Sequence, residues 1–252
     1  MIVVSPAKKL NLDSEDFNFE FSQPYFIPKT KKIVKKIRSL TVDELKSLMN
    51  ISDSLAILNF QRFREFDFSR QNVKPAVFLF SGDTFNGLSI RKMNLESLEY
   101  AQKKLRILSG LYGILRPFDN IKPYRLEMGT NIESLLGEDL YKFWLNEITN
   151  KLNNDLKNEK SNYLFNLASR EYFKSIDERK LLVRVINFDF KKIKNSKISN
   201  IGMMIKKCRG LMAKFLIEKE VNTLDKIQSF NEFGFKFDSF NKSNNTFLFV
   251  SR

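Results

Sequence analysis

The chain has 252 residues, of which 42% are hydrophobic and 29% charged, the composition of a globular protein long enough to bury a sizeable core. Its apolar runs are too short to cross a bilayer, and the absence of histidine excludes histidine-dependent catalytic triads and histidine-ligated metal sites. The formal net charge of +14 favours a polyanionic partner such as nucleic acid, although an A/T-rich genome would also raise the lysine content.

The first half of the chain predicts two buried strands with helices between and after them. Met1–Val4 and Ala76–Phe80 are short apolar runs without polar alternation, which is typical of strands buried on both faces. Thr41 and Glu44 have the spacing of a capping box, so we expect a helix that ends near Met49. Further helical patterns cover Ser52–Phe63 and Asn94–Arg106.

The second half combines helices with several short strands. Glu138–Leu156 has a helical pattern that carries Trp144 into the core, and Gly210–Lys219 is also helical. Strand patterns cover Tyr163–Leu167, Leu181–Phe188, Ile201–Ile205, Phe233–Phe237 and Thr246–Val250. Because no linker interrupts these patterns, we expect a single domain over residues 1–252. Its class would be α/β (mixed α+β), with a mixed, largely buried sheet and flanking helices.

The cysteine content and the N-terminal residues indicate the cellular compartment of the protein. Met1–Pro6 lacks the sections of a signal peptide, and the lone Cys208 excludes an internal disulfide and suits a reducing environment. We therefore expect a cytoplasmic protein without membrane contact. Neighbouring cations would favour the Cys208 thiolate, but no resolving cysteine exists, so we favour a buried structural thiol over a peroxide-reactive one.

Two glycines stand out in Leu105–Pro117, where an apolar run is followed by an arginine and a proline. Gly110 and Gly113 can adopt backbone angles that other residues reach only at a cost. Their amides could face a phosphate while Arg106 and Arg116 supply positive charge. The alternative is a tight turn between two buried elements, which fits this segment equally well. The arginine, tyrosine and glutamate side chains that follow directly favour a binding surface.

Positive charge is concentrated in three stretches of the chain. In Lys29–Arg38 a basic face accompanies Ile33 and Ile37 at helical spacing. Arg91–Arg125 overlaps the glycine segment, and Lys191–Arg209 surrounds a short apolar run. A basic helix face is usually only solvated, but charge segregated in this way is what a phosphate-binding face requires.

Blocks along nearly the whole sequence resemble the YaaA family of bacterial peroxide stress proteins. In chain order they are Ser5–Lys8, Gly82–Leu88, Leu105–Pro117, Pro123–Met128, Asn166–Lys174 and Arg209–Phe215. The resemblance implies an unusual single-domain α/β fold with a basic cleft and a helix-hairpin-helix-like element that binds duplex DNA. It also implies a role in limiting iron-linked oxidative damage. In this sequence the helix-hairpin-helix-like element would map to Leu108–Arg116.

The DNA-binding hypothesis expects double-stranded or distorted DNA as the partner, with no obligate protein partner, no cofactor and no metal. Phosphate contacts fix position without reading base sequence, so DNA shape or damage would decide affinity. The expected DNA-binding residues are Lys8, Arg106, Ser109, Gly110, Leu111, Tyr112, Gly113, Arg116, Tyr124, Arg125, Lys206, Lys207 and Arg209. Direct iron binding is disfavoured, because carboxylates and one cysteine select iron poorly.

An enzyme acting on a nucleotide or a damaged base is the alternative, so the question of catalysis stays open. Lys8 follows a predicted strand end, where α/β folds bind ligands, and could act as nucleophile or base. Asp83 and Glu127 lie in other glycine-bounded loops and could orient it or activate water. We favour the simpler interpretation, in which Lys8 contacts a phosphate and the two carboxylates are its ion-pair partners or turn caps.

Overall fold

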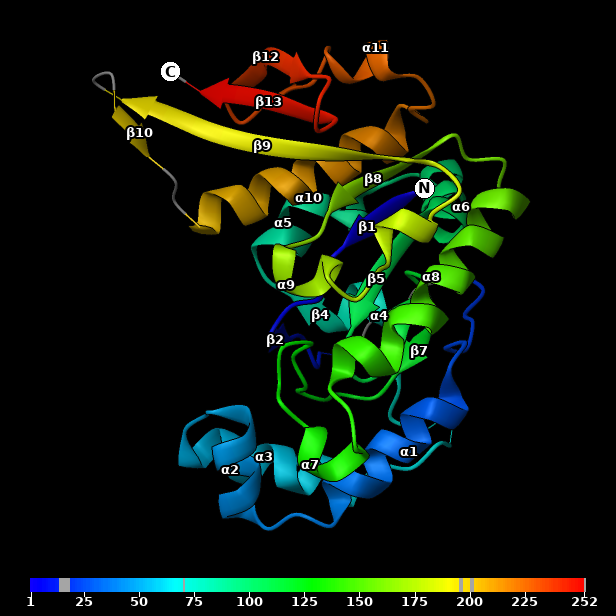
Figure 1. Cartoon of the computed structure of the whole chain (residues 1–252), viewed down its shortest axis with the longest axis vertical. Coiled ribbons are helices and arrows are strands. Elements are labelled where there is room, and N and C mark those ends of the chain that lie inside the picture. Colours follow the sequence, from blue (N-terminus) through cyan, green and yellow to red (C-terminus); the bar gives the residue numbers. More distant parts are fainter. Residues whose placement is uncertain (14–18, 70, 195–196, 200–201, 252) are drawn as a thin grey trace.

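The computed structural model describes residues 1–13, 19–69, 71–194, 197–199 and 202–251 (Figure 1). The strands of its main sheet are β1 (Ile2–Val4), β5 (Leu105–Ser109), β6 (Gly113–Leu115), β8 (Tyr163–Leu167), β9 (Arg184–Lys194), β10 (Lys197–Ser199), β11 (Asn231–Glu232), β12 (Phe235–Asn241) and β13 (Thr246–Ser251). Their spatial order is β11-β12-β13-β9-β8-β1-β5-β6, with β10 paired to β9. Parallel and antiparallel pairs both occur, so the mixed sheet expected from the sequence is confirmed.

Strand β1 lies inside the sheet between two parallel neighbours. Ile2 is opposite Leu105 of β5 on one side and Phe165 of β8 on the other. All three residues of β1 are buried, which explains why the strand is a continuous apolar run without alternation. The carboxyl ends of β1, β5 and β8 therefore meet at one edge of the sheet, and the loops after them converge there.

Two small sheets and a set of helices surround the main sheet. The small sheets pair β2 (Lys9–Leu10) with β4 (Phe80–Ser81), and β3 (Lys74–Pro75) with β7 (Asn120–Ile121). The helices are α1 (Ile27–Arg38), α2 (Val42–Met49), α3 (Asp53–Arg64), α4 (Ala76–Leu79), α5 (Asp83–Leu88), α6 (Leu95–Lys104), α7 (Glu133–Leu136), α8 (Leu140–Asn158), α9 (Arg170–Phe173), α10 (Gly202–Glu218) and α11 (Leu224–Ile227), with short 3₁₀ turns at Ile90–Lys92 and Glu178–Lys180. Figure 1 shows α1, α2, α3 and α7 gathered at the end of the molecule opposite β12 and β13.

Several local predictions are confirmed. The capping box before α2 is complete, because the Glu44 amide donates to Thr41 Oγ1 (3.3 Å) and the Thr41 amide donates to Glu44 Oε2 (2.7 Å). Trp144 of α8 is fully buried, and its indole nitrogen donates to the Gly110 carbonyl oxygen at 2.9 Å. The expected α/β class with a largely buried sheet is confirmed as well.

Two strand predictions are wrong. Ala76–Phe80 forms the short helix α4 and only then enters β4, because a buried apolar run without periodicity does not distinguish helix from strand. Residues 202–205 open helix α10, and Ile201 lies outside the described residues. The β-branched residues of Ile201–Ile205 suggested a strand, but packing of α10 on α5 overrides that local preference.

The segment expected to form a helix-hairpin-helix-like element is a β-hairpin. Strands β5 and β6 pair Ile107 with Leu115 and Ser109 with Gly113, and the turn between them is buried. Gly113 has a φ of +73°, and a Cβ there would lie 2.7 Å from Trp144 Cε3, so only glycine fits this turn. The mapping to Leu108–Arg116 is therefore wrong, and the alternative of a tight turn between buried elements is confirmed.

Candidate functional site

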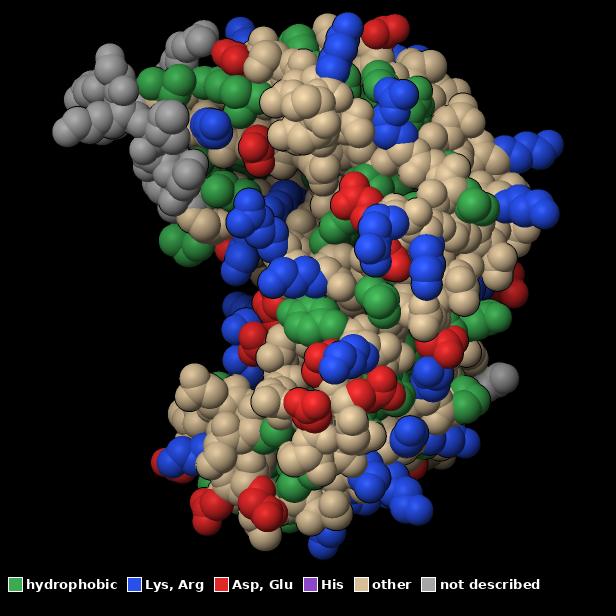
Figure 2. All heavy atoms as spheres, viewed as in Figure 1, with side chains coloured by type: hydrophobic (Ala, Val, Ile, Leu, Met, Phe, Trp, Pro, Cys, Tyr) green, Lys and Arg blue, Asp and Glu red, His purple; other side chains and the backbone are tan. Residues whose placement is uncertain are grey.

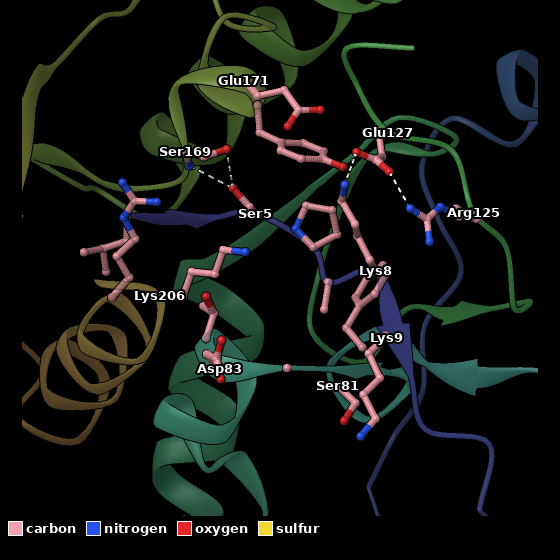
Figure 3. A pocket seen from close by; sticks show the side chains of 18 of the residues that line it. Ser5, Lys8, Lys9, Ser81, Asp83, Arg125, Glu127, Ser169, Glu171 and Lys206 are labelled. Carbon is pink, nitrogen blue, oxygen red and sulfur yellow. Dashed lines mark hydrogen bonds and ion pairs between the residues drawn. The ribbon is translucent and has the colours of Figure 1, made fainter. Parts of the chain in front are cut away.

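A pocket of about 420 Å³ opens at the carboxyl ends of β1 and β8 (Figure 3). Segments far apart in the sequence line it: residues 5–9, 80–84 and 124–127, parts of 167–172, and two cations of α10. β5 pairs with β1 on one side, and β8, which comes later in the chain, pairs with β1 on the other side, so the direction of strand addition reverses at β1. Crevices at such reversals, outside the carboxyl ends of parallel strands, are where open α/β sheets bind ligands.

An ion-pair triad joins two walls of this pocket. Lys8 Nζ lies 2.6 Å from Glu127 Oε2, and Arg125 donates from a terminal guanidinium nitrogen to Glu127 Oε1 at 3.0 Å. Lys8 and Glu127, which are 119 positions apart in the sequence, are thus in direct contact. The Lys8 side chain is 63% exposed, which is unlike the desolvated setting that activates a lysine nucleophile. Charge pairing is therefore the simplest role of this contact.

Serine hydroxyls fix the loops that follow β1 and β8. The Ser169 amide donates to Ser5 Oγ at 2.8 Å, and the Ser5 hydroxyl donates to Ser169 Oγ at 3.3 Å. Glu171 Oε1 accepts from the Gly129 amide at 3.1 Å. Sequence reasoning did not select these three side chains, although Ser5 directly follows β1 and all lie in or beside the blocks that carry the resemblance.

Two tyrosines form part of the pocket wall as neutral hydroxyls. Burial raises the pKa of Tyr124 and of Tyr172 well above the ordinary value. The Tyr124 hydroxyl lies 2.6 Å from Ser109 Oγ, which ties the pocket to the turn end of β5. Tyr124 is almost fully buried, so it supports the wall and offers little ring surface for stacking on a base.

Cations outnumber carboxylates around the pocket. The cationic side chains are Lys8, Lys9, Arg125, Lys206 and Arg209, and the carboxylates are Asp83, Glu127 and Glu171. Figure 3 shows Asp83 on the Lys206 side of the pocket and Glu127 across from it beside Lys8. No hydrogen bond or ion pair joins Asp83 to Lys8 or Glu127 within the described part of the chain, so the three residues of the enzyme hypothesis share a pocket without forming one contact cluster.

Two guanidinium groups of the pocket differ in how they are paired. The Nε of Arg125 is buried with no hydrogen-bond acceptor among the residues that the structure describes. Arg209 of α10 is partly buried and makes no hydrogen bond or ion pair to any described residue. Burial lowers the pKa of Arg209, and the charge of Asp189 opposes that shift. Arg125 therefore lacks an acceptor only at Nε, and Arg209 has no direct partner although the charge of Asp189 acts on it.

The pocket collects five of the residues expected to bind DNA: Lys8, Tyr124, Arg125, Lys206 and Arg209. The others lie elsewhere. Ser109, Gly110, Leu111, Tyr112 and Gly113 are buried in the β5–β6 hairpin. Arg106 is buried against Asp155, Arg116 pairs with Asp119 at 2.9 Å, and the Lys207 ammonium lies 4.2 Å from the centre of the Phe233 ring. Direct DNA contact by Arg106 and by the hairpin turn is therefore corrected to a structural role.

The surface around the pocket is concave. In Figure 2 Lys and Arg side chains gather along the hollowed left flank, between the part of the molecule that holds α10 and the part that holds α2 and α3. At the lower end of this flank, α2 and α3 form a helical hairpin through Asn50, whose backbone is left-handed with φ of 48°. We refer to this hollowed flank, from the pocket to the α2–α3 hairpin, as the basic flank.

The single cysteine of the chain, Cys208, lies in the interior. Cys208 is fully buried, and burial raises the pKa of its thiol to about 12, so it stays a thiol at neutral pH. Within the described ranges no group of three His, Cys, Asp or Glu side chains is arranged to hold a metal ion. None of the described helices is both long and apolar enough to cross a membrane.

Comparison with known proteins gives one consistent result. The family described as "Peroxide stress protein YaaA" matches residues 1–240. A UPF0246 protein of Legionella pneumophila (strain Corby) is 41% identical over 253 residues, covering 99% of this chain and 98% of the relative. UPF0246 proteins of Aliivibrio fischeri (strain MJ11) and Flavobacterium psychrophilum are 42% and 44% identical, over 99% of this chain and 97% and 99% of their own lengths. The chain therefore belongs to the YaaA family of peroxide stress proteins.

Proposed function

We propose that this protein binds duplex or distorted DNA on its basic flank and thereby limits iron-linked oxidative damage during peroxide stress. The observation that supports the proposal most is the cation excess of the pocket, where five Lys and Arg side chains face three carboxylates. The exposed ammonium groups of Lys9 and Lys206 at this pocket attract phosphate oxygens of the DNA backbone. Such contacts give affinity without base specificity.

The second part of the proposed surface is the α2–α3 hairpin. We assign to it the helical hairpin that the resemblance led us to expect at Leu108–Arg116. Ser52 precedes α3 and makes no side-chain capping bond, so the first amides of α3 are available to an external acceptor such as phosphate. In Figure 1 α2 and α3 lie at the lower end of the left side, and α5 and α10, which carry pocket residues, lie above them on the same side, so a single duplex could contact both.

The salt dependence of DNA affinity tests the proposal. Each neutralised phosphate contributes about 0.9 to the slope of log affinity against log salt on duplex DNA. We expect the double substitution Lys9→Ala/Lys206→Ala to flatten that slope by about 1.8 on a hydroxyl-ended duplex, because both ammonium groups line the pocket and are exposed. The measurement is fluorescence anisotropy of labelled duplex across a salt series.

The matched control is Lys157→Ala/Lys226→Ala, which removes the same charge from α8 and α11. These helices lie away from the basic flank in Figure 1. The control should leave the slope close to that of the wild type. If both double variants flatten the slope equally, diffuse net charge rather than the basic flank binds the DNA, and the proposal is wrong.

An enzyme acting on a nucleotide or a damaged base is the second candidate. The Lys8–Glu127 contact of 2.6 Å favours it, because it places an amine and a carboxylate together in a ligand-sized pocket. Asp83→Asn and Glu127→Gln separate the two candidates when conversion of a nucleotide or damaged-base substrate is measured beside DNA affinity. A binding protein keeps its DNA affinity after both changes, whereas an enzyme loses turnover and retains affinity.

A further inference from the structure

We propose that the pocket at the carboxyl ends of β1 and β8 binds a phosphomonoester: the terminal phosphate of a DNA strand or of a free mononucleotide. The strand-end form rests on the proposed DNA binding, whereas the mononucleotide form does not depend on it. The proposal concerns one bound group inside the pocket, and it is separate from the phosphate backbone contacts along the basic flank.

The first support is the state of Arg125. One terminal nitrogen of its guanidinium donates to Glu127 Oε1 at 3.0 Å, and the side chain is only 18% exposed. Its Nε is buried and has no acceptor among the described residues. Because this nitrogen is fully buried, Arg125 adds positive charge to the wall of the pocket without donating to a ligand through Nε. The carboxylate beside it holds the guanidinium in place.

The second support is Arg209. Its side chain lines the pocket and also an adjoining hollow of about 540 Å³, which Asn166, Asn187 and Phe188 help to form. Arg209 is partly buried and has no hydrogen-bond or ion-pair partner among the residues described, and the charge of Asp189, which also lines the hollow, acts on it from farther away. The Asn166 amide group donates to Asn187 Oδ1 at 2.9 Å, so these two side chains form an ordered wall. A phosphate at Arg209 would leave room in the hollow for the attached nucleoside.

The carboxylates of the pocket favour a single terminal phosphate over a continuous strand. Asp83, Glu127 and Glu171 would repel a run of phosphodiesters drawn into the pocket, so the backbone contacts are expected at the exposed Lys9 and Lys206 and only a terminal phosphate inside it. A phosphomonoester carries a charge of about −1.5 to −2 at pH 7 and presents three terminal oxygens, whereas a diester carries a single negative charge. Lys206 and Arg209, which are three residues apart on α10 and both line the pocket, supply two positive charges that match the higher charge of the monoester.

Paired ligands that differ only in the phosphate test this inference. Anisotropy compares a duplex with a short 5′ overhang ending in phosphate against the same duplex ending in hydroxyl, and a 3′-phosphate version is included. Calorimetry compares dAMP with deoxyadenosine. We expect about tenfold tighter binding of the phosphorylated partner in at least one pair, the gain from a charge-assisted bidentate contact.

Substitutions at Arg209 locate the effect. Arg209→Gln should reduce the phosphate preference to about one, and Arg209→Lys should reduce it strongly, because lysine keeps the charge but loses the planar fork. The second variant retains a long cationic side chain, so the test does not depend on the folding of the first. Arg179→Gln is the matched control, since Arg179 is exposed, pairs with Asp177 and lies outside the pocket.

The outcomes distinguish a strand end from a free mononucleotide as the ligand, and they distinguish this inference from the proposed DNA binding. Preference for phosphorylated ends with no preference for dAMP identifies the strand end, and the reverse identifies a mononucleotide. Binding of dAMP without any DNA binding supports this inference while refuting the proposed function. Equal binding within every pair, or a preference that Arg209→Gln and Arg209→Lys leave intact, overturns the inference and leaves DNA binding on the basic flank untouched.

Discussion

Replacement of Asp155 by alanine is expected to destabilise the fold by about 3–5 kcal/mol, because it leaves the Arg106 guanidinium buried without its counter-charge. Arg106 Nε donates to Asp155 Oδ2 at 2.8 Å, and the two side chains are 5% and 7% exposed. Lys151 also contacts Asp155. Urea unfolding followed by circular dichroism measures the loss. DNA affinity of the folded variant should be unchanged, since Arg106 does not reach the surface.

The same pair predicts a pH dependence. Burial alone would raise the pKa of Asp155, but the charges and hydrogen bonds of Arg106 and Lys151 outweigh it and lower the pKa below 3.8. The ionised carboxylate therefore stabilises the fold fully above that ordinary value, and its contribution disappears as the pH falls through the lowered one. The difference in unfolding free energy between wild type and variant should shrink only in strong acid.

Glu147→Ala is the control for Asp155→Ala. Glu147 lies on the same helix, α8, and pairs with Lys29 at 2.9 Å, but its side chain is much more exposed. An exposed pair of this kind is worth about 0–1 kcal/mol. If Asp155→Ala costs no more than Glu147→Ala, the buried pair does not support the fold, and the prediction is wrong.

Gly210→Ala is expected to destabilise the protein by about 1–3 kcal/mol or more, and to weaken DNA binding. Both effects are expected because α10 and α5 pack backbone against backbone at this position. A Cβ on Gly210 would clash with the Thr84 carbonyl oxygen and lie 2.8 Å from the Leu88 nitrogen. Neither atom belongs to a flexible side chain, so the helices must separate. Since α10 carries Arg209 and α5 begins at Asp83, their separation deforms the pocket. Thermal unfolding and anisotropy record the two effects.

Gly202→Ala supplies the comparison on the same helix. A Cβ there meets nothing within 4 Å, and alanine is a better helix former than glycine, so stability should stay the same or rise slightly. Equal unfolding temperatures for the two variants would show that α5 and α10 can move apart without cost. The close approach of the two helices would then not hold the pocket together.

Local signals in the sequence predicted the elements that depend on local interactions. Thr41 and Glu44 cap α2 through bonds within four residues, and the apolar run of β1 has no alternation because both faces are covered. Ala76–Leu79 carries the same type of signal as β1, yet forms a helix. The difference lies in which neighbours surround each run, and a short apolar sequence does not contain that information.

At the glycine segment, phosphate binding and close packing produce the same sequence pattern, so the sequence did not distinguish them. Gly110 and Gly113 were interpreted as phosphate contacts, but the indole of Trp144, which the chain brings in from α8, requires a glycine at the second position. The contact between Lys8 and Glu127 was expected only as one of two interpretations, because it joins loops that meet through the pairing order of the sheet. The hydrogen bonds between Ser5 and Ser169 could not be predicted, because the two residues meet only through the pairing of β1 with β8.

Because β1 lies between β5 and β8 in the sheet, the sheet cannot form completely until these later strands have been synthesised. Ile2 pairs with Leu105 and Phe165, so β1 leaves the ribosome long before either neighbour exists. At about 5–20 residues per second, the wait for β8 is on the order of ten seconds or more. The β5–β6 hairpin is local and forms first, whereas the pairings of β1 have high contact order and form late. Until then the nascent chain exposes an apolar strand, which is a target for chaperones.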